Sequence, residues 1–246
     1  MEYQSVRMTH VDGTMHHLGV NEKHVAKKVI LTPSPLLIPL LATCMDDAVK
    51  MGDYREYVTF TGKYWGKPLT VMSCGFGCMP MAIAVEELRH LGCTEIIKIA
   101  PCAAIQEDIE VGTLLTAHGA VRGEGASAEY VDGSYPAVAD MDLLGRILNT
   151  GKCDTGIFRS HDCLSNESPS APHGMDRVNH WRELGVSVMD GETSSMFTIG
   201  GILGLKTASI ALIEENYLTG KKLNAKDTEI GIKDAFRLAA EALLCC

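Results

Sequence analysis

The chain has 246 residues, of which 46% are hydrophobic and 22% charged, and its formal net charge is −9. This composition excludes a mostly disordered chain, and the absence of any apolar run of about 18 residues argues against a membrane span or membrane partner. The scattered basic residues argue against nucleic acid as a partner, and the amino terminus has no secretory signal pattern, so we expect a cytoplasmic protein.

The first half of the chain alternates predicted strands with a helix. Apolar runs predict strands at 27–32, 54–64, 67–74, 95–100 and 112–121, the second and third joined at Trp65-Gly66. Apolar residues at helical spacing predict a helix over 81–92, which Gly92 ends.

The second half continues the alternation. We predict helices over 136–148, 191–204 and 227–244, an apolar strand before Asp190, and a strand over 206–215. The Ser- and Pro-rich segment 163–177 is predicted to be a surface loop. Residues 1–246 therefore read as a single α/β domain with helices on both faces of a sheet.

The nine cysteines include no C-x-x-C pair, which argues against a structural zinc site. In a chain without a secretory signal they are expected to be reduced thiols, most of them small core residues.

Two features of the first half of the chain could carry chemistry. Gly75, in the turn from Ser73 to Cys78, would let the backbone approach a ligand near helix-start amides, although glycine also serves turn geometry alone. Lys98 interrupts a strand that should be covered on both faces, so it must find a partner, reach solvent or serve a ligand.

Acidic residues lie at two predicted strand ends. Asp190 and Glu192 open a helix, and Glu214 and Glu215 end the last strand. They could simply interact with the positive end of a helix dipole. Alternatively, they could accept hydrogen bonds from sugar hydroxyls, because ligands gather at strand ends in α/β sheets.

Taken together, these segments resemble the nucleoside phosphorylase family, in its uridine and purine nucleoside phosphorylase branch and most like the uridine phosphorylase side. The likeness covers nearly the whole chain, and the block from Arg55 to Asp140 carries it most strongly, with the runs EELRHLG, AIQEDIEVG and YPAVAD. The resemblance implies a three-layer α/β/α sandwich around a mixed, barrel-like sheet. It also implies a dimer, or trimer of dimers, whose active sites are shared between subunits.

The resemblance further implies phosphorolysis of a nucleoside, with inorganic phosphate as co-substrate and no cofactor or metal. By position, His17 and Arg55 match residues that reach ribose and phosphate in the adjacent subunit, and Glu192 matches the ribose-binding glutamate. Asp190 matches the first acid of the family's Glu-Met-Glu run, of which Glu192 is the last, and Lys98 matches the family's buried phosphate-binding arginine.

At the base, Glu215 is the nearest match to the acid of the purine enzymes, and Tyr217 matches an arginine of the uridine enzymes. The family's phosphate-binding loop begins here at Pro33, and Leu37 stands where that loop has an arginine. Pro101 stands where the family has a serine or threonine. The base-reading residues of the family have no evident replacement in the loop near Ser168.

These departures leave three hypotheses. The first is an active phosphorylase with an altered phosphate site, the second a nucleosidase that uses water, and the third a catalytically silent nucleoside-binding relative.

Overall fold

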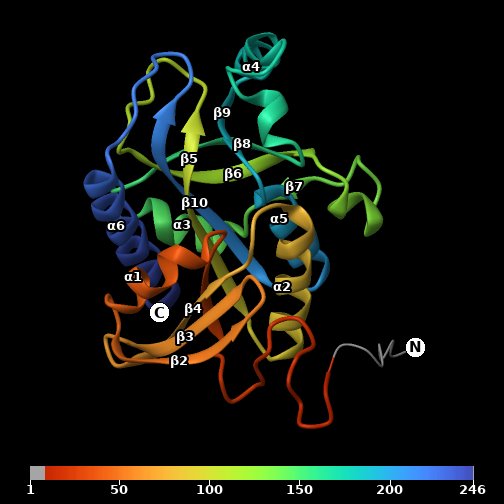
Figure 1. Ribbon diagram of the computed structural model, residues 1–246, viewed down its shortest axis with the longest axis vertical. Helices are drawn as coiled ribbons and strands as arrows, with labels where there is room; N and C mark the ends of the chain where they lie inside the picture. The colour runs from red at the N-terminus through yellow and green to blue at the C-terminus, as the bar shows by residue number, and fades with distance from the viewer. Residues whose placement is uncertain (1–8, 246) are drawn as a thin grey trace.

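The computed structural model describes residues 9–245, and its ten strands form one mixed sheet around which the helices pack (Figure 1). The strands are β1 (Lys28–Thr32), β2 (Asp46–Tyr54), β3 (Tyr57–Tyr64), β4 (Lys67–Ser73), β5 (Glu95–Ala104), β6 (Leu114–Gly123), β7 (Ala137–Val138), β8 (Asp154–His161), β9 (Val186–Asp190) and β10 (Lys206–Asn216). The α-helices are α1 (Ile38–Ala42), α2 (Cys78–His90), α3 (Met141–Leu148), α4 (Gly174–Glu183), α5 (Thr193–Ile202) and α6 (Ala225–Leu244), and the 3-10 helices are η1 (Pro35–Leu37), η2 (Ala126–Glu129) and η3 (Leu164–Glu167).

Five of the strands close into a ring. Their order is β10-β6-β8-β9-β5, and β5 also pairs with β10 in parallel, which closes the circle. The sheet continues from β5 through β1 and β4 to the antiparallel strands β3 and β2. This is the mixed, barrel-like sheet that the family resemblance implies.

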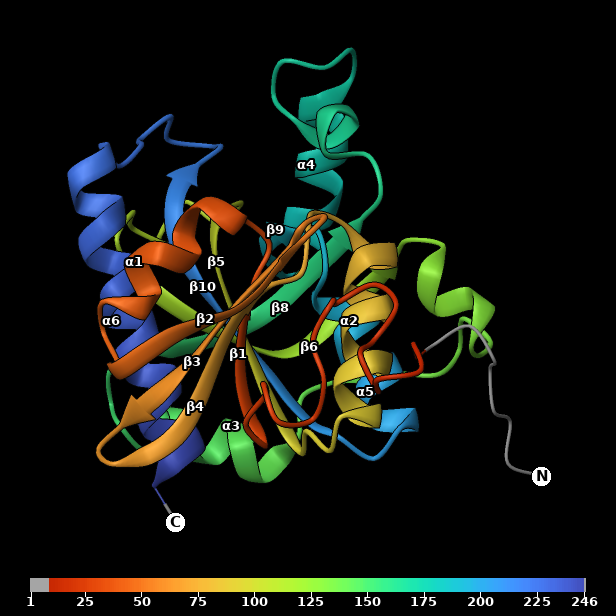
Figure 2. The ribbon, with the colours of Figure 1, turned by 60° about the horizontal axis from the view of Figure 1, so that its bottom comes forward.

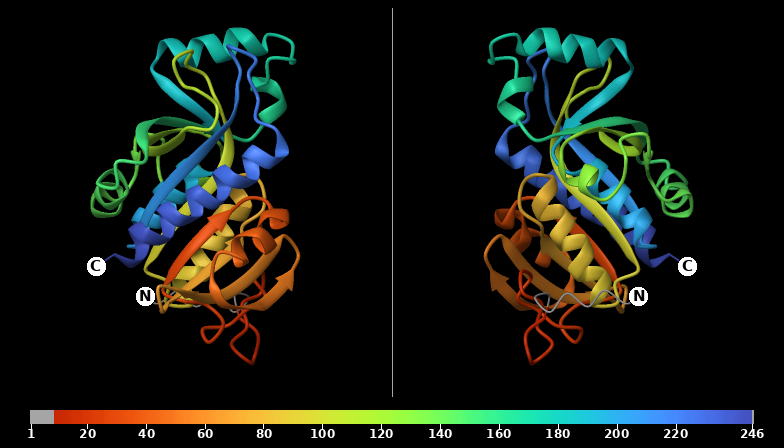
Figure 3. Two further views of the ribbon diagram at one scale, coloured as in Figure 1. Left: turned by 90° about the vertical axis from the view of Figure 1, so that its left-hand side faces the viewer. Right: turned by 90° about the vertical axis from the view of Figure 1, so that its right-hand side faces the viewer.

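Two helical layers cover the sheet. Helices α2 and α5 lie together on one flank, and α1 and α6 lie on the other (Figure 2). The side views place α4 at the end of the molecule opposite β2–β4 (Figure 3). The three-layer prediction is therefore confirmed.

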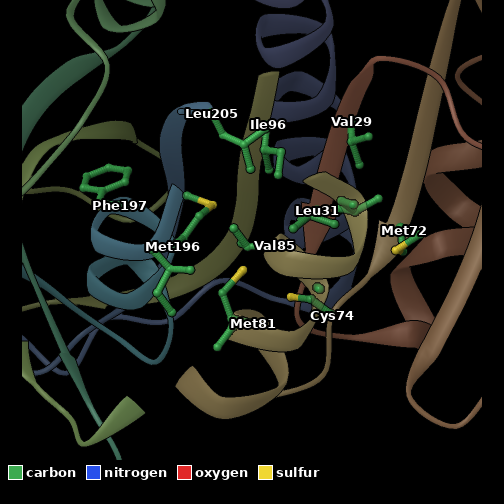
Figure 4. Close-up of a cluster of buried hydrophobic side chains, with 14 of the residues drawn as sticks. Val29, Leu31, Met72, Cys74, Met81, Val85, Ile96, Met196, Phe197 and Leu205 are labelled. Carbon is green, nitrogen blue, oxygen red and sulfur yellow. The ribbon is translucent and has the colours of Figure 1, made fainter. Parts of the chain in front are cut away.

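Alternation along the central strands explains the two cores. Val29 and Leu31 of β1 face the core under α2 and α5, whereas Ile30 between them joins the core under α6. Figure 4 shows the first of these cores, with side chains of α2 and α5 meeting those of β1 and β5. Both cores are closed to solvent, so they hold the strand ends that carry the site in fixed positions.

Most predicted elements are confirmed, and three expectations were wrong. The strand predicted from residue 54 begins at Tyr57, because Arg55 lies in the turn after β2 with a positive φ of 54°. The helix predicted over 136–148 begins only at Met141, after the short strand β7, because the Asp140 side chain caps it there. The predicted loop 163–177 contains η3 and the first turn of α4.

Two further expectations concern the burial of the cysteines and a membrane span. The eight cysteines among residues 9–245 are free thiols. Six of them contribute to the core, as expected: Cys74, Cys78 and Cys93 are buried, and Cys44, Cys102 and Cys153 are partly buried and pack against the two cores. Within the same residues no helix is long and apolar enough to cross a membrane.

Candidate active site

A cavity of about 200 Å³ opens where several strands of the ring end. Its walls come from β5, β8, β9 and β10, with further residues from the loops that follow β1 and β4. The lining residues are Pro33, Phe76, Ala100, Pro101, Cys102, Ala103, His161, Met189, Asp190, Gly191, Glu192, Glu214, Glu215 and Tyr217. Side chains distant in the sequence are therefore gathered at one edge of the sheet.

Lys98 lies behind this cavity and is 1% exposed. It has the same parity along β5 as Ile96, so it points toward the side of the sheet that α5 covers. Its Nζ donates to Asp190 Oδ2 at 2.5 Å and forms an ion pair with Glu192 Oε2 at 2.9 Å. Of the alternatives that the sequence left open, the structure shows a lysine that has found partners.

Both carboxylate oxygens of Asp190, the last residue of β9, accept hydrogen bonds. Ser160 donates to its Oδ1 at 2.5 Å, and the Thr193 backbone and side chain both donate to its Oδ2. Burial by itself raises the pKa of this carboxyl, but the Lys98 ammonium and these hydrogen bonds bring the pKa below its usual value. Asp190 is therefore held as an anion.

The same contacts keep Lys98 charged. Burial on its own lowers the pKa of Lys98, but the carboxylates of Asp190 and Glu192 raise that pKa well above the usual range. One ammonium thus neutralises one of two carboxylates, and the triad keeps a net negative charge next to the cavity.

Glu192 also lines the cavity and is held by two groups behind it. The Gly77 amide donates to its Oε1 at 3.0 Å, and Lys98 holds its Oε2. Each carboxylate oxygen has two acceptor positions, so both oxygens can accept a further hydrogen bond from a ligand hydroxyl. This arrangement suits the recognition of a diol.

Glu214, Glu215 and Tyr217 also line the cavity, at the end of β10 and directly after it. Thr228 donates to Glu214 Oε1 at 3.2 Å, and Lys222 donates to Glu215 Oε2 at 3.4 Å on the surface. Burial raises the pKa of the Tyr217 hydroxyl, so it remains a hydrogen-bond donor at neutral pH.

The structure brings five of the predicted site residues to one place. Asp190, Glu192, Glu215 and Tyr217 line the cavity, and Lys98 lies behind the first two. Three other predicted residues lie elsewhere on the same chain. The imidazole of His17 donates to Glu87 at 2.6 Å beside α2, and the Arg55 guanidinium lies 5.3 Å from the Tyr54 ring in an exposed turn. For these two residues, a role in the site of a second copy stays a prediction.

Gly75 does not line the cavity. Its φ is +74°, and a Cβ at this position would lie 2.8 Å from Glu56 Cγ, so a side chain would not fit. Turn geometry alone therefore explains this glycine, and a ligand contact by Gly75 stays a prediction.

The wall where the family's phosphate residues would lie is apolar. Pro33, Ala100 and Pro101 form it, while Leu37 packs into the core under α6. Among the described residues that line the cavity there is no lysine or arginine. Any anion in this cavity would therefore need a cation from outside the lining.

Sequence reasoning missed one polar residue of the lining, His161 at the end of β8. Its ring is 5% exposed, and its Nε2 lies 3.8 Å from Glu167 Oε2. Burial lowers the pKa of His161 more than the neighbouring Glu167 carboxylate raises it, so the ring is neutral at neutral pH. The only sequence signal was a histidine at the end of a strand that we did not predict.

Comparison with known proteins gives one consistent picture. The family model described as "Phosphorylase superfamily" matches residues 27–244. A uridine phosphorylase of Thermococcus kodakarensis is 31% identical over 94% of this chain and 88% of its own length. A guanosine phosphorylase of Halorubrum lacusprofundi is also 31% identical, over 85% of this chain and 86% of its own length.

A solved structure agrees with these relatives. The crystal structure of uridine phosphorylase from Vibrio fischeri superposes with a TM-score of 0.87 at 32% identity, covering 99% of this chain and all of the other. The fold, the length matched and the carboxylates at the strand ends lead to one conclusion: this chain belongs to the phosphorylase superfamily.

Proposed function

We propose that the protein is a pentosyltransferase that cleaves the N-glycosidic bond of a nucleoside with inorganic phosphate, giving the free base and ribose 1-phosphate. The observation that carries this proposal is Glu192, which the Gly77 amide and Lys98 hold at the cavity wall with acceptor positions to spare. The family membership and the relatives named uridine and guanosine phosphorylase support it.

Each part of the cavity has a task in this reaction. Glu192 accepts hydrogen bonds from the ribose hydroxyls and fixes the sugar, which raises the rate by orienting the anomeric carbon. Positive charge then develops on the sugar as the base departs, and the net negative charge of the Lys98–Asp190–Glu192 triad stabilises it. The phosphate oxygen attacks the anomeric carbon, and the bonding electron pair leaves with the base.

Phosphate needs cations that this cavity does not supply from its own lining. We propose that Arg55 of a second copy supplies one, as part of a dimer or trimer of dimers. Arg55 is exposed in the turn after β2, and a guanidinium beside an aromatic ring can still bind an oxyanion bidentately through its N–H groups. With fewer cations than the family pattern, turnover should be slow.

A second candidate is a nucleosidase that uses water, and one observation favours it. Lys98 is enclosed by two carboxylates, and the wall beside Pro101 is apolar, so a neutral nucleophile would meet less repulsion than phosphate. Both candidates keep the same role for Glu192.

Measuring the release of free base with and without phosphate distinguishes the phosphorylase from the nucleosidase. Uridine, inosine and adenosine would each be incubated with the protein, and the free base measured by chromatography. We expect slow release that requires phosphate, and Glu192→Gln should reduce it roughly 10- to 150-fold because a charged hydrogen-bond partner is lost.

The matched control is Glu110→Gln, which removes an exposed carboxylate paired with Lys221 and should leave the rate unchanged. Release that does not depend on phosphate would favour the nucleosidase. No release from any nucleoside by the folded protein would contradict both and leave a silent binding protein.

A further inference from the structure

A buried polar cluster lies behind His161 of the cavity lining, and neither the ribose nor the phosphate site uses it. Arg159, two residues before His161 on β8, donates to Glu167 of η3 through Nε at 2.9 Å and through Nη2 at 2.7 Å. The guanidinium also lies 4.0 Å from the centre of the Trp181 ring on α4. One arginine thus ties together a strand, a 3-10 helix and a helix.

This cluster fixes the surroundings of His161. Glu167 accepts both Arg159 hydrogen bonds and presents its Oε2 3.8 Å from His161 Nε2, a distance longer than a hydrogen bond but short enough to orient the ring electrostatically. The side chains of Arg159 and Glu167 are only 10% and 7% exposed. Ring, carboxylate and guanidinium therefore form a preorganised row that ends at the cavity.

Such a row is not explained by stability alone. A buried ion pair often gains little over apolar side chains of the same size, because both ions lose their hydration. The chain nevertheless keeps Arg159 and Glu167 buried directly behind a cavity-lining imidazole. A role in holding that imidazole for a ligand accounts for the arrangement.

The position of His161 indicates which part of a ligand it meets. Ser160 pairs with Asp190 and donates to its carboxylate, so the next residue of β8, His161, points to the opposite face of the strand from the Lys98 triad. There it lines the same cavity as Glu215 and Tyr217. A sugar held by Glu192 would direct its base away from the Lys98 triad. A neutral imidazole offers one donor and one acceptor, which matches a base edge with an N–H beside a ring nitrogen or carbonyl.

We propose that His161 is the residue that recognises the base of the nucleoside, with Glu167 and Arg159 as the positioning residues behind it. This inference rests on the proposed function and deepens it. His161 would take the place of the base-reading group that the segment 163–177 lacks. It lies at the end of β8, just before that segment.

The test measures steady-state kinetics and nucleoside binding for His161→Ala and His161→Gln. We expect His161→Ala to raise KM about 10-fold and to change the preference among uridine, inosine and adenosine, with a smaller effect on kcat. His161→Gln, which keeps a donor and an acceptor, should recover part of the loss. His90→Ala, at the exposed end of α2, is the matched control and should behave as the unmodified protein.

The outcomes keep the two proposals apart. If the unmodified protein cleaves or binds nucleosides and both His161 variants, folded by circular dichroism, keep its KM and base preference, the inference on His161 is wrong and the proposed function stands. If the unmodified protein neither cleaves nor binds any of the three nucleosides by calorimetry, the proposed function fails and this inference fails with it.

Discussion

Replacing Lys98 by methionine would test the electrostatics on which the site depends. The substitution keeps an unbranched side chain of similar length but leaves Asp190 and Glu192 as two buried carboxylates without their shared cation. Breaking a buried ion pair by removing one partner costs about 3–5 kcal/mol. Asp190 retains its hydrogen bonds from Ser160 and Thr193, so the protein should still fold.

For a chain of this size, about 3–5 kcal/mol corresponds to a decrease in Tm of roughly 6 to 20 °C. Chemical denaturation followed by far-UV circular dichroism would give the change in unfolding free energy. The control is Lys221→Met, which removes an exposed lysine paired with Glu110 and should leave the midpoint nearly unchanged.

The pH dependence gives the sign of the effect. In the unmodified protein the pKa of Asp190 lies below its usual value, so its stabilising contribution is present above about pH 4 and is lost as the pH falls through that lowered pKa. Without Lys98, burial dominates and raises this pKa, so protonation relieves the charge as the pH falls. The difference in stability between the two proteins should therefore shrink from pH 7 toward pH 4.

Two results would refute this reasoning. One is a loss of less than about 1 kcal/mol at pH 7, which would mean that water or relaxation replaces the cation. The other is a difference that grows as the pH falls, which would mean that the carboxylates are not the source of the penalty.

Two further predictions concern the loop before β1 and the wall of the cavity. Glu87→Gln should lower the unfolding free energy by about 1–3 kcal/mol and speed amide exchange at Leu18, because the buried carboxylate accepts from the backbones of His17 and Leu18 and an amide would replace one acceptor by a donor. Unchanged exchange at Leu18 would count against it. Pro101→Thr adds a hydroxyl to the apolar wall and should lower the KM for phosphate several-fold; an unchanged or higher KM in a folded variant would show that this wall does not face phosphate.

The sequence predicted the elements that carry strong apolar patterns and missed those that do not. Strands β1, β5 and β10 are continuous apolar runs because helices cover both of their faces. By contrast, β2 reads DDAVKMGDY and is mostly exposed at the edge of the sheet, so no apolar pattern marks it. Pairing with β3 makes this segment a strand.

The candidate site divides in the same way. Lys98 was conspicuous because a lysine in a buried strand requires a partner, and Asp190 and Glu192 stood out at a strand end. The identity of the partner could not be deduced, because Lys98 and Asp190 are 92 positions apart and meet only when β5 and β9 have joined one closed sheet.

His161 shows the limit most clearly. Glu167 approaches the His161 ring, and Arg159 holds Glu167 and stacks on Trp181, only after β8, η3 and α4 have packed. A segment rich in serine and proline predicted a loop, and its sequence gave no sign that Glu167 turns inward.

The most direct test of the account is a crystal structure of the protein grown with a nucleoside and phosphate. We predict the ribose hydroxyls within hydrogen-bond distance of the Glu192 carboxylate, with the base beside His161. A nucleoside bound away from this cavity, or a sugar that does not touch Glu192, would contradict the account.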